Sequence, residues 1–145
     1  MNYFFDTSAL IKIYHIETGS DGVLDIYNSV NTITISELSK IEFLSTISKK
    51  YREKEINEET LEAVISKFEE DLKNKFKLFR FSSLVLDESK TLIKKHAKDF
   101  SLKTIDSIQL AFFKTYCEDE EVFVCADKRL VKVAELEGFT VMVPV

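Results

Sequence analysis

The chain has 145 residues, of which 45% are hydrophobic and 31% are charged, with only 3 Gly and 1 Pro. This length predicts a single domain over residues 1–145, long enough to bury about two thirds of its unfolded surface. The apolar fraction excludes a disordered chain, and the few glycines exclude a Gly-rich nucleotide-binding loop. The net charge of −5 at pH 7 argues against non-specific coating of nucleic acid, because that binding mode needs a basic surface.

The cysteines and the N-terminal residues indicate the compartment. Cys117 and Cys125 form no C-x-x-C pair, and a small secreted scaffold would carry more cysteines, so we expect two reduced thiols. The N-terminal stretch lacks a basic segment and is interrupted by Asp6, which argues against a signal peptide. No apolar run approaches the roughly 18 residues of a membrane span. We therefore expect a cytoplasmic protein with no membrane partner.

Short apolar segments alternate with helical patterns along the whole chain. In chain order, the first half predicts a strand at residues 2–5, helices at 10–16 and 23–27, a strand at 32–35, a helix from an N-cap at Ser36 to about residue 51, and a helix from an N-cap at Asn57 to residue 72. The second half predicts a strand at 76–81, a helix from residue 82 or 83 to 93, a helix from an N-cap at Thr104 to 112, a strand at 122–125, a helix at 130–136 that Gly138 ends, and a strand at 140–143. This alternation predicts a three-layer α/β/α fold with a mainly parallel central sheet.

Three aspartates lie where such a sheet binds ligands, beyond the carboxyl ends of its strands. Asp6 and Asp127 follow the first and fourth expected strands, and Asp106 lies in the first turn of the helix that Thr104 opens. Each aspartate alone has an ordinary interpretation, because Asp caps helices and satisfies free backbone N–H groups.

Glu42 is a fourth acid, at the edge of the apolar stripe of its predicted helix. A carboxylate partly withdrawn from water needs a partner or a cation. The ordinary alternatives are that Glu42 reaches solvent or pairs with a nearby lysine.

The four acids have a joint interpretation if the fold brings them to one crevice. Crowded carboxylates repel one another and raise their pKa values unless a divalent cation bridges them. Oxygen-only ligands favour Mg²⁺ or Mn²⁺ over zinc, and such ions commonly bind phosphate and activate water. The pattern therefore predicts metal-dependent phosphodiester hydrolysis at Asp6, Glu42, Asp106 and Asp127.

Four sequence blocks carry a family resemblance. They are FDTSAL around Asp6, TISELSKIEF ending beside Glu42, LKTIDSIQLA around Asp106, and VFVCADKRL around Asp127. In this order and with these gaps, the blocks resemble the motifs of the PIN-domain ribonucleases, above all the VapC toxins of bacterial and archaeal toxin–antitoxin pairs.

The resemblance implies a PIN-like fold and an endoribonuclease that uses Mg²⁺ or Mn²⁺ to hydrolyse RNA phosphodiester bonds, leaving a 5′-phosphate and a 3′-hydroxyl. Asp6, Glu42, Asp106 and Asp127 then form the metal site, and Ser8 matches the family serine that orients it. Cys125 stands where the family commonly has Thr, Ser or Asn, so we expect weaker positioning of Asp127. The resemblance also implies an antitoxin partner and a homodimer.

Three other functions remain open at this point. The chain could be a stand-alone PIN nuclease of RNA processing, or a non-catalytic module that binds RNA or protein. A phosphatase with an aspartyl nucleophile ranks last, because Ser8 replaces the second acid of its usual D-x-D pattern. The basic residues near the motifs, which either contact RNA phosphates or are merely solvated, are Lys12, Lys40, Lys103, Lys128 and Arg129.

Overall fold

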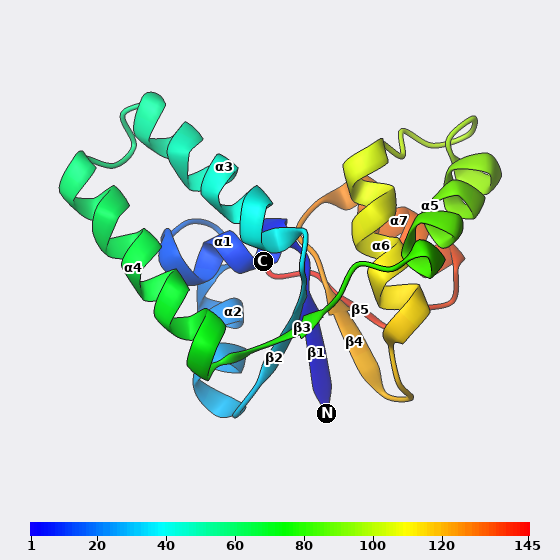
Figure 1. Cartoon of the computed structure of the whole chain (residues 1–145), viewed down its shortest axis with the longest axis horizontal. Helices are drawn as coiled ribbons and strands as arrows, with labels where there is room; N and C mark the ends of the chain where they lie inside the picture. Colours follow the sequence, from blue (N-terminus) through cyan, green and yellow to red (C-terminus); the bar gives the residue numbers. More distant parts are fainter.

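A computed structural model describes all residues of the chain, Met1–Val145. Its elements in chain order are β1 (Asn2–Phe5), α1 (Thr7–Tyr14), α2 (Ser20–Ser29), β2 (Ile33–Ser36), α3 (Ser39–Arg52), α4 (Glu58–Asn74), β3 (Phe76–Phe79), α5 (Ser83–His96), α6 (Thr104–Tyr116), β4 (Glu121–Val124), α7 (Lys128–Leu136) and β5 (Val141–Met142) (Figure 1). The strands form one parallel sheet in the order β3-β2-β1-β4-β5. The predicted three-layer α/β/α architecture is confirmed.

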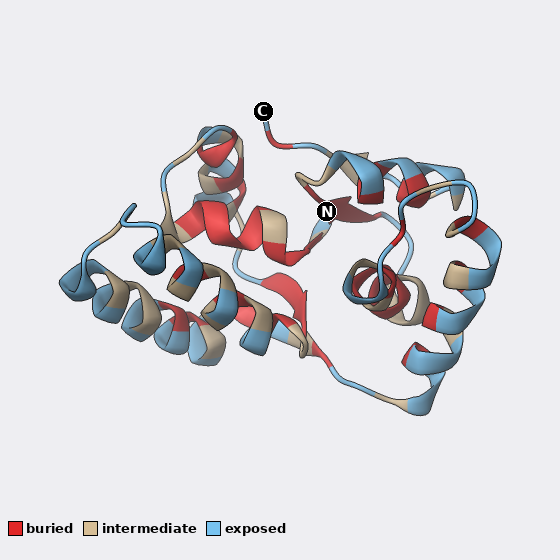
Figure 2. Cartoon of the chain, turned by 90° about the horizontal axis from the view of Figure 1, so that it is seen from above, coloured by how far each residue is buried: buried red, intermediate tan, exposed pale blue.

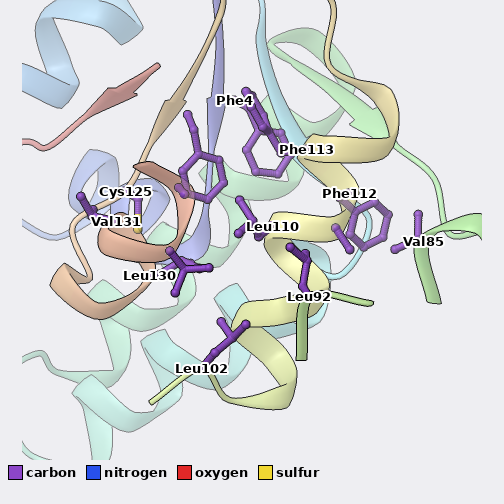
Figure 3. Packing of buried hydrophobic residues seen from close by; sticks show 14 of the residues in the cluster. Phe4, Val85, Leu92, Leu102, Leu110, Phe112, Phe113, Cys125, Leu130 and Val131 are labelled. Atoms are coloured by element: carbon purple, nitrogen blue, oxygen red, sulfur yellow. The ribbon is translucent and has the colours of Figure 1, made fainter. Parts of the chain in front are cut away.

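The two helical layers follow from the alternation of side chains along the strands. Phe4 and Phe5 are both fully buried but belong to two different core clusters, because successive residues of a strand point to opposite faces of the sheet. Helices α1 to α4 cover the face of Phe5, and α5 to α7 cover the face of Phe4 (Figure 1). Figure 3 shows the second of these clusters, in which Phe4, Phe113 and Leu110 pack together.

Burial differs sharply among the helices. Helix α1 is buried along most of its length, whereas α3 and α4 keep exposed outer faces (Figure 2). Because it is buried, α1 is a central element, and its N-terminus is fixed against the sheet.

None of the helices is long and apolar enough to cross a lipid bilayer.

Two predicted helix starts are wrong, and two predicted helix signals are confirmed. Ser36 is the last residue of β2 rather than an N-cap, because a turn at residues 37–38 precedes α3, although Ser36 Oγ still accepts a hydrogen bond from Ser39 N–H at 3.3 Å. Thr104 is the first residue of α6, whose N-cap is Lys103. Asn57 caps α4 through Thr60 N–H at 2.8 Å, and Gly138 follows α7 with a φ of 86°.

The strand order creates a crevice between β1 and β4. The chain runs outward from β1 to β2 and β3, then returns to the other side of β1 to form β4. The connections after β1 and β4 therefore leave toward opposite layers, and ligands of open α/β sheets bind at such a switch point.

Candidate active site

The four acids that the sequence singled out line one cleft at this switch point. The cleft has a volume of about 250 Å³ and is lined by eight residues, none of them hydrophobic: Asp6, Thr7, Ser8, Glu42, Thr46, Asp106, Gln109 and Asp127. The acids come from the N-cap of α1, the first turns of α3 and α6, and the N-cap of α7. Four separate segments thus contribute one carboxylate each.

Asp6 is the most buried of the four acids and caps α1. Its Oδ1 accepts hydrogen bonds from Ala9 N–H at 3.1 Å and Ser8 Oγ at 2.6 Å, and its Oδ2 accepts one from the Cys125 thiol at 3.1 Å. Only 4% of Asp6 is exposed. Burial raises the pKa of Asp6 to about 6, although these hydrogen bonds favour the charged form. The hydrogen bonds hold the Asp6 carboxylate in one orientation, while burial disfavours its charged form.

Ser8 and Cys125 connect the start of α1 to the end of β4. Besides donating to Asp6, Ser8 Oγ accepts a hydrogen bond from Ala126 N–H at 2.9 Å. The Cys125 side chain was expected to affect Asp127, yet its thiol donates to Asp6 and approaches only the backbone oxygen of Asp127, at 3.6 Å. The presence of Cys125 at this position therefore affects the orientation of Asp6.

Glu42 does not pair with a lysine. Its Oε1 accepts hydrogen bonds from Thr7 Oγ1 at 2.8 Å and from Gln109 Nε2 at 2.7 Å. These contacts tie α3 to α1 and α6. Glu42 is half-buried, so its carboxylate is reachable from the cleft but held by neutral donors.

Gln109 is a site residue that the sequence analysis missed. It is 2% exposed. Its amide nitrogen, which donates to Glu42, also lies 2.9 Å from Ser39 Oγ and 3.1 Å from Thr7 Oγ1. Its Oε1 accepts from Ser36. The signal was present: a single amide in an apolar run, three residues after Asp106, faces the same side of a helix.

Asp106 and Asp127 are the other two acids of the cleft. Burial, and after it the charges of Asp127 and Glu42, raise the pKa of Asp106 to about 6, while Lys103 opposes the rise. Asp127 Oδ1 accepts hydrogen bonds from Arg129 N–H at 2.9 Å and Leu130 N–H at 3.4 Å, so it caps α7. Asp6 and Asp127 therefore both cap a helix and line the cleft.

The chemistry of the cleft fits a divalent cation. No Lys, Arg or His lines it, and all ion pairs of the structure lie elsewhere, so its carboxylates have no cationic partner. The donors are oxygens, which suit Mg²⁺ or Mn²⁺. No three His, Cys, Asp or Glu side chains are arranged to hold a metal directly. The arrangement therefore fits a hydrated ion that contacts one or two carboxylates and reaches the others through water, a common mode for Mg²⁺.

Of the basic residues near the motifs, Lys12 neither contacts the cleft nor is solvated. Lys12 is 9% exposed, and its Nζ donates to Thr18 O at 2.6 Å and to Glu17 Oε1 at 3.1 Å. It belongs to a partly buried ion pair between α1 and the loop that follows, because its position on α1 faces inward. Lys40, Lys103, Lys128 and Arg129 are exposed.

Comparisons with known proteins agree with this architecture. The family model of the PIN domain matches residues 3–136. Among solved structures, the chain is similar to a toxin–antitoxin complex from Klebsiella pneumoniae, with 19% identity, a TM-score of 0.62 and coverage of 99% of this chain and 98% of that one. It is also similar to VapBC2 from Rickettsia felis bound to a promoter DNA fragment, with 16% identity, a TM-score of 0.66 and coverage of 98% of each chain.

A third similar structure is VapC20 from Mycobacterium tuberculosis, a toxin that cleaves the sarcin–ricin loop. It has 12% identity and a TM-score of 0.68, with coverage of 96% of this chain and 97% of that one. A search of curated proteins finds no significant match. At these identities the structural likeness concerns the fold.

Proposed function

This chain belongs to the PIN domain family, and we propose that it is an endoribonuclease that depends on Mg²⁺ or Mn²⁺ and serves as the toxin of a toxin–antitoxin pair. One observation carries the proposal: four carboxylates from four segments line a polar cleft that contains no cationic side chain. Such a cleft suits a cation and, with it, the anionic group of a phosphodiester.

Asp6, Glu42, Asp106 and Asp127 are the residues that would hold the cation, directly or through water. When bound, a divalent cation neutralises charge on a phosphoryl group and activates water for attack at phosphorus. Neither His15 nor His96 lines the cleft, so neither is placed to act there as a general base.

Neighbouring residues of the chain hold the acids of the site in position. Ser8, Cys125 and the N-terminus of α1 orient Asp6, and Gln109 with Thr7 orients Glu42. Preformed positions matter because a site that is already oriented does not reorganise during the reaction. The side chains of the other three acids each accept hydrogen bonds from the protein, whereas the Asp106 carboxylate accepts none. The Asp106 carboxylate is therefore the one free to adjust to a cation.

The similar structures support the substrate and the partner. Two of them are toxin–antitoxin complexes, and the third is a toxin that cleaves the sarcin–ricin loop. We therefore propose RNA as the substrate and an antitoxin protein as the partner, and we expect the chain to form a homodimer. A stand-alone nuclease of RNA processing would share the cleft but have no antitoxin.

The test is cleavage of labelled RNA by the purified chain, with Mg²⁺ or Mn²⁺ and with EDTA. We expect cleavage only with the cation, and we expect Asp6→Asn and Asp106→Asn to abolish it while circular dichroism shows an intact fold. Asp87→Asn removes an exposed carboxylate of α5 and is the matched control. Cleavage that persists in EDTA, or in Asp106→Asn at the wild-type rate, would overturn the proposal.

Expression in a bacterial host separates the toxin from the stand-alone nuclease. A toxin should arrest growth, and co-expression of the protein encoded next to its gene should restore it. An active nuclease that leaves growth unaffected would contradict the toxin assignment.

A further inference from the structure

A second concave surface lies beside the acidic cleft. It has a volume of about 240 Å³ and is lined by Phe100, Ser101, Lys128, Arg129 and Lys132, which we call the basic groove. Phe100 and Ser101 belong to the loop between α5 and α6, and the three cations belong to α7. No acidic side chain lines this groove.

The cations of the basic groove are free. Lys128, Arg129 and Lys132 are exposed, and none of them takes part in an ion pair. In a chain with a net charge of −5, three unpaired cations around one hollow form a local positive field. Such a field attracts an anionic ligand that the rest of the surface repels.

The groove is fixed next to the cleft. Asp127 lines the acidic cleft, and Lys128, the next residue, lines the groove. Leu130 and Val131 of α7 and Leu102 of the α5–α6 loop belong to one buried cluster (Figure 3). Both walls of the groove are therefore anchored in the core that also supports Asp127.

Phe100 gives the groove an apolar, aromatic lining. It is half-buried and packs against the same cluster, so its ring is held in place rather than free in solvent. Nucleobases stack on such rings, and this contact adds about 1–3 kcal/mol per base by alanine substitution in proteins that bind single strands. An acidic polypeptide would use the cations but gain little from the ring.

We propose that the basic groove binds single-stranded RNA beside the site of cleavage, with phosphates on Lys128, Arg129 and Lys132 and a base on Phe100. This inference rests on the proposed nuclease function and names the side of the cleft along which the strand runs. Phosphate contacts position the strand without selecting sequence. The stacked base restricts the substrate to single-stranded RNA, because each base of a duplex is covered on both faces by its stacked neighbours.

The test is binding of a short fluorescent single-stranded RNA in EDTA, followed by anisotropy over a range of salt concentrations. Lys128→Ala/Lys132→Ala should bind about tenfold more weakly, and the slope of log K against log salt should fall by about 1.4, since each lost phosphate contact removes about 0.7. Lys73→Ala/Lys90→Ala, which removes two exposed, unpaired lysines of α4 and α5, should bind as wild type.

The aromatic contact has its own pair of variants. Phe100→Leu keeps an apolar side chain and should weaken binding about fivefold or more with no change in the salt slope. Phe100→Tyr keeps the ring and should bind as wild type. Unchanged affinity and slope in the double lysine variant would overturn the proposal. A second result would also overturn the proposal: Phe100→Leu binds RNA as tightly as wild type, and polyglutamate competes with RNA for the groove. That result would assign the groove to an acidic protein.

Failure of this inference differs from failure of the proposed function. Binding in EDTA does not depend on cleavage, so RNA that binds through the groove but is never cut refutes the nuclease and leaves the groove. RNA that is cut equally well by wild type and by the groove variants, with equal affinity, refutes only the groove.

Discussion

Replacing Asp6 with Asn should make the metal-free chain more stable at neutral pH, although Asp6 belongs to the proposed active site. Burial raises the pKa of Asp6 to about 6, whereas the ordinary value is 3.8. The folded chain therefore holds this proton more tightly than the unfolded chain does. Because the unfolded state binds fewer protons in this range, stability falls as pH rises from about 4 to about 6.

The size of the effect follows from the same two values. A fully buried carboxyl group shifted from 3.8 to about 6 destabilises the fold by about 3 kcal/mol at pH 7 and by less than about 1 kcal/mol at pH 4. Asn removes the charge and keeps an oxygen that can cap α1 through Ala9 N–H. The Cys125 thiol loses a carboxylate acceptor, which costs about 1 kcal/mol. The net gain should be about 2 kcal/mol at pH 7.

The assay is urea unfolding of both chains in EDTA, followed by far-ultraviolet circular dichroism because the chain has 0 Trp. The gain in unfolding free energy should be present at pH 7 and mostly gone at pH 4. Asp87→Asn, on the exposed face of α5, controls for a general change of net charge. A variant that is no more stable at pH 7, or whose advantage is the same at both pH values, would show that burial does not penalise the Asp6 charge.

Three further predictions concern other buried polar groups. Gln109→Leu should lower kcat/KM for RNA cleavage about tenfold to a hundredfold, because Glu42 loses a charge-assisted hydrogen bond worth about 1.5–3 kcal/mol; unchanged kinetics would contradict this role. Glu121→Gln should raise the free energy of unfolding at pH 7 by about 1 kcal/mol in urea titrations, because burial raises the pKa of Glu121 and its Oε1 has no partner. Glu137→Gln should lower it by about 1–3 kcal/mol at pH 7. Burial opposes the charge of Glu137, but hydrogen bonds from cations, first among them Lys114, lower its pKa to about 2, so this loss should shrink as pH falls from 4.5 toward 2.

The acids of the cleft show that a capping role and a site role are compatible. Asp6 and Asp127 each accept backbone hydrogen bonds at the start of a helix, which is the ordinary interpretation of such residues. The same helix starts lie at the carboxyl ends of β1 and β4, where the sheet opens its crevice. Helix capping orients these carboxylates, and the topology places them in the cleft.

Local sequence patterns determined the elements of this protein. The short apolar segment that contains Phe4 and Phe5 marks a strand, and Asn57 and Gly138 mark the start and end of helices. These signals act over one strand or one helical turn, so neighbouring residues are enough to produce them. The placement of the acids after strands, together with the four motif blocks, likewise pointed to one cleft before any tertiary contact was known.

Tertiary packing decided what the acids and cations touch. Gln109 is visible in the sequence only as an amide in an apolar run, and it acquires Glu42 as a partner because α6 packs beside α1 and α3. Lys12 lies next to a motif yet forms a partly buried ion pair with Glu17. Phe100 and Lys132 line one groove only because the α5–α6 loop and α7 pack on the same core. Charges and hydrogen bonds act through space at a few ångströms, so their partners depend on how distant segments fold together rather than on their order along the chain.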